Sequence, residues 1–185
     1  FDLSVASWEA YSFMLDPIPV SWLKSAKRMS FRMTAADVIG EPMSHHRFMT
    51  AVLRFGVLIK RLSPEQNIGL LLPTSAGGAI ANMAVLSLGK TIVNLNYTAS
   101  SEALQSAAQQ ANLKRIYTSK RFLAKLKERS IDIQEIYPDI PLTYLEDLKE
   151  TIPKYQLLLT LVMSMLLPAW LLQWLYFGSI NINST

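Results

Sequence analysis

The chain contains no cysteine, and this absence removes several kinds of chemistry at once. Disulfide bonds, thiolate metal sites and a cysteine nucleophile are excluded, and a reducing compartment is compatible with the composition. Histidine is also scarce, since His45 and His46 are the only two. Adjacent residues of a helix point in different directions, and no carboxylate stands at ligand spacing. The two histidines therefore favour a surface or capping role over a metal site.

Charged residues are few as well, and the shortage is local. They make up 17% of the 185 residues, whereas roughly 25% is usual for a soluble domain. The stretch 155–185 contains no Asp, Glu, Lys or Arg. The net charge of +4 is modest and no nucleic-acid-binding motif accompanies it, so we expect no nucleic-acid partner. The chain begins at Phe1 without an initiator Met or a signal-peptide pattern, which suggests a processed or excised segment.

Two tempting motifs lack essential residues. Gly89-Lys90-Thr91 ends like a nucleotide P-loop, but the required earlier glycine is replaced by Ala84. The intervening residues favour a helix, and Gly89 is expected to end it in the left-handed conformation. Ser75 with Gly77-Gly78 does not follow the strand–elbow–helix pattern of a hydrolase. No nucleophile is therefore assigned.

What is present is a regular alternation of helix and strand patterns. Apolar residues at three- and four-residue spacing predict a long helix from Ser44 to Leu62. Short apolar runs predict strands at 68–72, 91–95, 115–118 and 142–145, separated by helices at 76–88, 100–110 and 120–128. Such alternation predicts an α/β fold with a parallel sheet and crossover helices. We divide the chain into a helical lead-in (1–33), with a hairpin or loop expected over 33–41, an α/β region (34–150) and an apolar helical tail (151–185).

The tail is long and apolar enough to raise the question of a membrane. Residues 157–177 match the roughly 20 residues that a helix needs to cross a bilayer, although Pro168 and Gln173 interrupt the run. Three interpretations fit: a helix lying in or on the membrane, a buried helix of a larger domain, and a transmembrane span. Trp170, Trp174 and Tyr176 cluster towards one end, as interfacial aromatic residues do, and are the candidate membrane contacts.

Basic residues concentrate between residues 114 and 129. A solvated helix face is the simplest interpretation of this run. The more specific alternative is contact with anionic lipid headgroups or with an acidic carrier protein. The candidates for that contact are Lys120, Arg121 and Lys125.

The order of these segments resembles the N-terminal subdomain of the adenylate-forming (AMP-binding) superfamily. The matching parts are the turn 40–44, the helix to Leu62, the strand and turn 68–74, the alanine-rich helix 76–89 and the strand and turn 93–97. Segments 96–99, 116–123 and 144–149 look like the ligase half of the bacterial bifunctional acyl-acyl-carrier-protein synthetase / 2-acylglycerophosphoethanolamine acyltransferases. The likeness extends over about residues 1–168.

The resemblance implies a parent enzyme that uses ATP and Mg²⁺ to convert a fatty acid into an acyl-adenylate. The acyl group would pass to acyl-carrier protein for lysophospholipid reacylation, at the cytoplasmic face of the bacterial inner membrane. The family's Ser/Thr/Gly-rich loop ending in Pro-Lys-Gly does not occur in the sequence, and Thr50 and Ala51 stand where a His-(x)4-Asp acyltransferase motif would need Asp.

No catalytic, cofactor-binding or metal residue is therefore transferred, and we expect a fragment that is inactive by itself and binds no ATP. Asn96 and Tyr97 match the family's turn, where we expect a structural role. A non-enzymatic, membrane-associated scaffold is the alternative from a different class.

Overall fold

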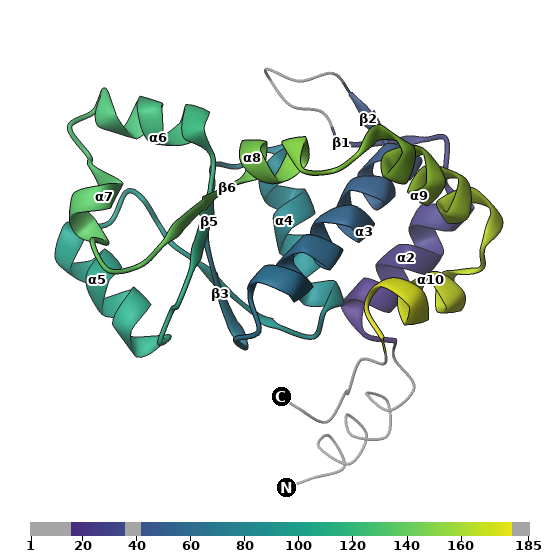
Figure 1. The fold of residues 1–185 in the computed structure, drawn as a ribbon, viewed down its shortest axis with the longest axis horizontal. Coiled ribbons are helices and arrows are strands. Elements are labelled where there is room, and N and C mark those ends of the chain that lie inside the picture. The colour runs from purple at the N-terminus through teal and green to yellow at the C-terminus, as the bar shows by residue number, and fades with distance from the viewer. Residues whose placement is uncertain (1–15, 36–41, 179–185) are drawn as a thin grey trace, which may run out of the picture.

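The computed structural model describes residues 16–35 and 42–178, and these form an α/β fold with helices on both sides of a sheet (Figure 1). The first described helix, α2 (Ile18–Arg28), starts directly after Pro17, with Pro19 in its first turn, where a missing N–H costs nothing. β1 (Met33–Ala35) and β2 (Met43–Ser44) pair antiparallel, which agrees with the expected hairpin. The parts of the lead-in and hairpin at 1–15 and 36–41 lie outside the described residues.

The main sheet is parallel, as predicted. Its strands are β3 (Asn67–Leu71), β4 (Thr91–Asn94), β5 (Ile116–Thr118) and β6 (Leu142–Tyr144), in the order β4-β3-β5-β6. All but the first residue of β3 are buried, which matches its unbroken apolar sequence. Because β4 and β5 flank β3 on opposite sides, the chain reverses its direction of winding at β3.

Three of the crossover helices begin at a serine that satisfies a backbone N–H. Ser75, Ser100 and Ser119 precede α4 (Ala76–Ser87), α5 (Ser101–Gln110) and α6 (Lys120–Lys127), and each hydroxyl accepts a hydrogen bond from the N–H three residues later. Gly89 follows α4 with φ of 68°, so it ends this helix as predicted. α8 (Leu145–Glu150) follows β6 directly. The four-residue helix α7 (Ile133–Ile136) was not anticipated from the sequence.

The sheet separates two cores. On one face, α3 (His45–Leu62) and α4 pack around residues such as Leu53, Ile59 and Val85. On the other face, α5, α6 and α7 enclose Leu104 and Ile116 (Figure 1). With both faces covered, the ends of the strands are where a ligand can approach the sheet.

His46 is buried, so the expected surface role is wrong for this residue. Its side chain is 5% exposed, and its ring packs edge-on against Phe31 with centroids 5.0 Å apart. Burial, followed by the positive charge of Lys27 and the neighbouring His45, lowers the pKa of His46. The neutral imidazole therefore acts as part of the packing.

The apolar tail forms two helices where the sequence allowed one. α9 (Lys154–Leu166) and α10 (Ala169–Tyr176) are separated at Leu167, because Pro168 cannot continue α9 and instead begins α10. Within residues 16–35 and 42–178, no helix combines the length and the apolar character that crossing a bilayer requires. α9 packs on α3, and α10 packs on α2 and α3.

Each helix of the tail buries only one of its sides against the core. Its inward residues include Leu172 and Phe177, and a Cβ at Gly56 of α3 would collide with the ring of Phe177. α9 turns the small hydroxyl side chains of Thr160 and Ser164 inward, at 1% and 0% exposure. Large apolar residues cover its outer side: Tyr155, Leu158, Leu159, Val162, Met165 and Leu166.

Candidate functional site

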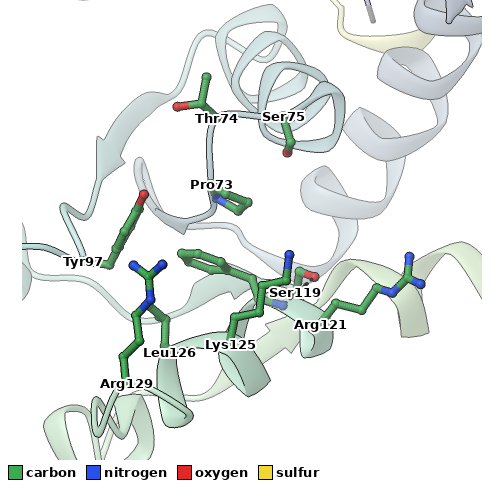
Figure 2. A pocket seen from close by; sticks show the side chains of 10 residues that line it. Pro73, Thr74, Ser75, Tyr97, Ser119, Arg121, Lys125, Leu126 and Arg129 are labelled. Atoms are coloured by element: carbon green, nitrogen blue, oxygen red, sulfur yellow. Dashed lines mark hydrogen bonds between the residues drawn. The ribbon is translucent and has the colours of Figure 1, made fainter. Parts of the chain in front are cut away.

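A cavity of about 580 Å³ lies at the carboxyl ends of the parallel strands (Figure 2). The loop after β3 contributes Pro73, Thr74 and Ser75 to its wall, and Tyr97 and Ser119 follow β4 and β5. This is the point at which the winding of the sheet reverses, and open α/β sheets bind ligands outside the strand ends at such a point.

Three cations from one helical face line the same cavity. Arg121, Lys125 and Arg129 are spaced four residues apart along α6 and its end, so they share a side. In the view of Figure 2, Lys125 and Arg129 rise from α6 towards the loop after β3 and Tyr97, whereas Arg121 extends away from them. No carboxylate of the described residues forms an ion pair with any of the three. Unpaired cations in a concave site attract anions, and we name this cavity the anion pocket.

The positive end of α6 is already occupied by a carboxylate of the protein. Glu146 of α8 accepts hydrogen bonds from the Ser119 hydroxyl (2.7 Å, to Oε1) and from the Lys120 backbone N–H (3.1 Å, to Oε2). Burial raises the pKa of Glu146, but these hydrogen bonds outweigh it, and the net pKa is lowered. An external anion would therefore have to be bound by the side chains of the pocket, since the α6 N–H groups face Glu146.

Two packed aromatic rings form part of the wall of the pocket. The ring of Tyr97 meets that of Phe122 edge-on, with centroids 4.9 Å apart, and both residues line the cavity. The preceding Asn96 shapes the turn, because its Oδ1 accepts from the backbone N–H (3.1 Å) and the hydroxyl (2.8 Å) of Thr98. Asn96 has the structural role that the sequence predicted, whereas Tyr97 combines packing with a position at the site.

The structure divides the three predicted basic residues. Arg121 and Lys125 line the anion pocket, but Lys120 does not. The ammonium of Lys120 pairs with Asp147 and lies 5.5 Å from the centroid of the Tyr144 ring. The hydrogen bond to Asp147 is the largest of the effects that raise the pKa of Lys120.

The three predicted membrane contacts are also divided. Trp170 and Trp174 are exposed on the outer side of α10, at 69% and 64%. Tyr176 is half-buried, and its hydroxyl donates to Thr160 Oγ1 at 3.0 Å. α10 lies on the opposite side of the sheet from α6, so these residues and the anion pocket are separate features (Figure 1).

Sequence reasoning missed Thr74, Ser75, Ser119 and Arg129 as site residues. Two signals could have found them. The first three stand within three residues of the end of a predicted strand, and the ends of parallel strands meet at one edge of a sheet. Arg129 continues the four-residue spacing of Arg121 and Lys125. In the described part of the chain, no group of three His, Cys, Asp or Glu residues is placed to bind a metal.

No family model matches this chain, but solved structures share its fold. O-succinylbenzoate coenzyme A synthetase (MenE) from Bacillus subtilis, in complex with AMP, aligns with a TM-score of 0.58 at 16% identity, covering 72% of this chain and 33% of that chain. A fatty acyl CoA synthetase from Mycobacterium tuberculosis aligns with a TM-score of 0.56 at 13% identity, covering 75% of this chain and 28% of that chain.

The N-terminal subdomain of Klebsiella oxytoca NpsA, in complex with 3-hydroxybenzoyl-AMSN, aligns with a TM-score of 0.57 at 10% identity, covering 77% of this chain and 33% of that chain. The chain thus spans about a third of the length of the solved structures it matches. At these identities the likeness concerns the fold alone. This chain has the fold of the N-terminal domain of adenylate-forming enzymes.

Proposed function

We propose that this chain is the opening α/β portion of an adenylate-forming ligase, which activates a carboxylate with ATP to an acyl-adenylate. The observation that carries the proposal is the anion pocket at the strand ends of this fold, where Arg121, Lys125 and Arg129 have no ion-pair partner among the described residues. One protein of the same fold was solved with AMP. Because the chain spans about a third of such proteins, the activity belongs to the complete enzyme.

The role proposed for the pocket is to bind a phosphate group. Arginine and lysine are the side chains that recognise phosphate most often, and a guanidinium can do so with two parallel hydrogen bonds. The hydroxyl of Thr74 lies at the same cavity and can donate a further hydrogen bond. The phosphate would belong to ATP or to the prosthetic arm of a carrier protein, both of which the adenylate-forming resemblance implies, together with Mg²⁺ for the parent enzyme.

The finer part of the proposal concerns substrate and acceptor. We take the substrate to be a fatty acid, the acceptor to be acyl-carrier protein, and the final product to be a reacylated lysophospholipid. Segments 96–99, 116–123 and 144–149 support this choice through their resemblance to acyl-acyl-carrier-protein synthetases. A fatty acyl CoA synthetase also shares the fold.

Phosphate binding is tested on the 185-residue chain by calorimetric titration with pyrophosphate, AMP and 4′-phosphopantetheine. Tight binding of AMP would identify the nucleotide as the source of the phosphate and would overturn the sequence-based expectation that the chain alone binds no ATP. Tight binding of 4′-phosphopantetheine would identify the carrier arm. Neutralising Lys125 and Arg129 to Gln should weaken binding by about tenfold or more. Lys60→Gln with Arg61→Gln, on the exposed end of α3, is the matched control. Equal binding by both double variants would refute the anion pocket.

Adenylation itself is tested on the native gene product by carboxylate-dependent exchange of pyrophosphate into ATP. Exchange that requires long-chain fatty acids supports the whole proposal. Exchange with aromatic or amino acids but not with fatty acids would retain the ligase and overturn the fatty-acid assignment. Absence of exchange with any carboxylate would favour the scaffold described next.

A membrane-associated module is the second candidate, and the inverted polarity of α9 favours it. Small residues at a helix–helix contact and large apolar residues facing outward are the arrangement of helices that pack in lipid. α9 follows it, with buried Thr160 and Ser164 and with Leu158 and Leu166 exposed at 62% and 77%. The proposed location is the cytoplasmic face of the bacterial inner membrane, with Trp170 and Trp174 as the leading contacts.

Membrane association is tested by co-sedimentation of the chain with neutral and anionic vesicles. Trp170→Ser with Trp174→Ser should release the chain from both, because exposed tryptophans anchor at the lipid interface. Phe31→Ser with Met33→Ser, at exposed apolar positions outside the tail, is the control pair. Unchanged sedimentation of the tryptophan variant would leave α10 without a role in membrane contact.

A further inference from the structure

A second cavity, of about 350 Å³, lies between α3, α4, α8 and the start of α9, apart from the anion pocket. Nine of the residues that line it are apolar or glycine, among them Phe55, Ile80 and Leu157. The remaining two are Arg54 of α3 and Lys149 of α8, so every charged side chain at this cavity is a cation.

The guanidinium of Arg54 is not fully satisfied by the protein. One of its terminal nitrogens donates to Gln156 Oε1 of α9, but its Nε is buried and has no acceptor within the described residues. A buried charged donor without an acceptor is destabilising, and such groups call for an explanation. No carboxylate of the described ranges forms an ion pair with Arg54 or Lys149. The cavity thus combines an apolar wall with uncompensated positive charge.

We infer that this cavity binds a small carboxylate amphiphile, with its hydrocarbon chain against the apolar wall and its carboxylate between Arg54 and Lys149. A guanidinium matches the geometry of a carboxylate, and the carboxylate would supply the missing acceptor for Nε. Ligand pockets are typically of roughly 300–1,000 Å³, apolar, with a few polar groups that orient the ligand. A fatty acid is such an amphiphile, so the inference rests on the proposed function for the identity of its ligand and adds a binding site for it. It needs neither nucleotide nor the anion pocket, so octanoate binding and pyrophosphate exchange can fail independently.

The test is calorimetric titration of the 185-residue chain with hexanoate, octanoate and decanoate, below micelle-forming concentrations. One site is expected, with affinity rising by roughly three- to fourfold for each buried methylene until the cavity is full. Octyltrimethylammonium has a similar tail with a cationic head and should not bind. Arg54→Met should weaken octanoate binding by about tenfold or more, and Lys149→Met by a smaller factor, whereas Lys60→Met on the exposed end of α3 should leave it unchanged.

A second variant keeps the test decisive if Arg54→Met disturbs the bond to Gln156. Ala51→Leu fills the cavity and leaves Arg54 in place, so it should abolish octanoate binding while the chain still unfolds cooperatively on heating. The inference is overturned if no chain length binds, or if folded Arg54→Met or Ala51→Leu binds octanoate like the unaltered chain. It is equally overturned if Trp170→Ser with Trp174→Ser removes the binding, because the amphiphile would then coat the exposed side of the tail.

Discussion

The hydroxyl groups of Tyr117 and Ser63 lie 2.8 Å apart in the interior and join β5 to the end of α3. Both residues are fully buried. Tyr117→Phe removes one partner and leaves the Ser63 hydroxyl without it, which should lower the free energy of unfolding by about 1–2 kcal/mol. Denaturant unfolding of the two chains measures the difference.

The double variant Tyr117→Phe/Ser63→Ala separates this hydrogen bond from other effects. It should be less destabilised than the sum of the two single variants, because removing both polar groups leaves none of them unsatisfied. If the losses of unfolding free energy in the two single variants add up to the loss in the double variant, the two hydroxyl groups do not interact and the hydrogen bond is contradicted.

The stability of the fold should decline in alkali in a manner that depends on Tyr137. This residue is buried, and its hydroxyl donates to the carbonyl of Leu104 at 3.0 Å. Burial raises the pKa of Tyr137 from 10.0 to about 12. Below pH 10 its stabilising contribution is complete. Between the two values the unfolded chain loses its proton while the folded chain keeps it, so the contribution is lost as the pH rises.

The measurement is the difference in unfolding free energy between the unaltered chain and Tyr137→Phe. This difference should stay constant from pH 7 to about pH 9.5 and then shrink towards pH 12. A difference that grows over the alkaline range would mean that the folded state stabilises the phenolate.

Glu146 should contribute to stability only while it is ionised. Glu146→Gln weakens the hydrogen bonds from Ser119 and Lys120 and removes the charge at the start of α6, with an expected loss of about 1 kcal/mol at pH 7. Because the pKa of Glu146 is lowered from 4.5, the contribution is complete above pH 4.5 and is lost as the pH falls below it. The free energies of unfolding of the unaltered chain and of Glu146→Gln, measured by denaturant unfolding, should therefore converge in acid.

Glu150→Gln, on the same helix, is the control for this comparison, since no side-chain hydrogen bond or ion pair is formed by Glu150 within the described residues. Glu150→Gln should change stability by a few tenths of a kcal/mol at most. An equal effect of the two substitutions would show that general charge, and not the contact with α6, is responsible.

Two glycines should respond in opposite ways to alanine. A Cβ on Gly69 in β3 would lie 2.9 Å from the side chain of Leu113 and 3.0 Å from the Arg115 carbonyl oxygen, which is backbone and cannot move aside cheaply. Gly69→Ala should destabilise by about 1–3 kcal/mol. A Cβ on Gly77 in α4 meets nothing closer than 3.8 Å, so Gly77→Ala should be neutral or stabilising by up to about 1 kcal/mol. Thermal unfolding of both variants checks the contrast, and a reversed order would contradict the packing around β3.

The elements between Ser44 and Tyr144 could be predicted within one or two residues, because their signals are local. The helix and strand periods, the serine caps and Gly89 each act over a few residues. The helix α7 is only four residues long, which is too short for a helical period to be recognised in the sequence. The break at Pro168 was visible, but the choice between one helix and two depends on the surface against which α9 and α10 pack.

The candidate site was only partly predictable for a different reason. The basic run was visible, but the direction of each side chain depends on its rotation about α6 and on partners distant in sequence. Lys120 forms an ion pair with Asp147, which lies 27 positions later in the sequence. Arg129 belongs to the same basic run but was not among the three predicted contacts. Composition did not predict which side of α9 faces the core. Thr160 and Ser164 are buried there, although larger apolar residues were available in the same helix.

The ammonium of Lys27 in α2 donates to the carbonyls of Ser164 (2.8 Å), Met165 (3.2 Å) and Leu167, which end α9. The last of these partners is synthesised 140 positions after Lys27. At about 5–20 residues per second, the ribosome would deliver it roughly 7–28 s later. During that interval the side of α2 that α10 later covers lacks this partner. Among the described residues, α2 therefore completes its packing only after α10 has been synthesised, so this contact forms late.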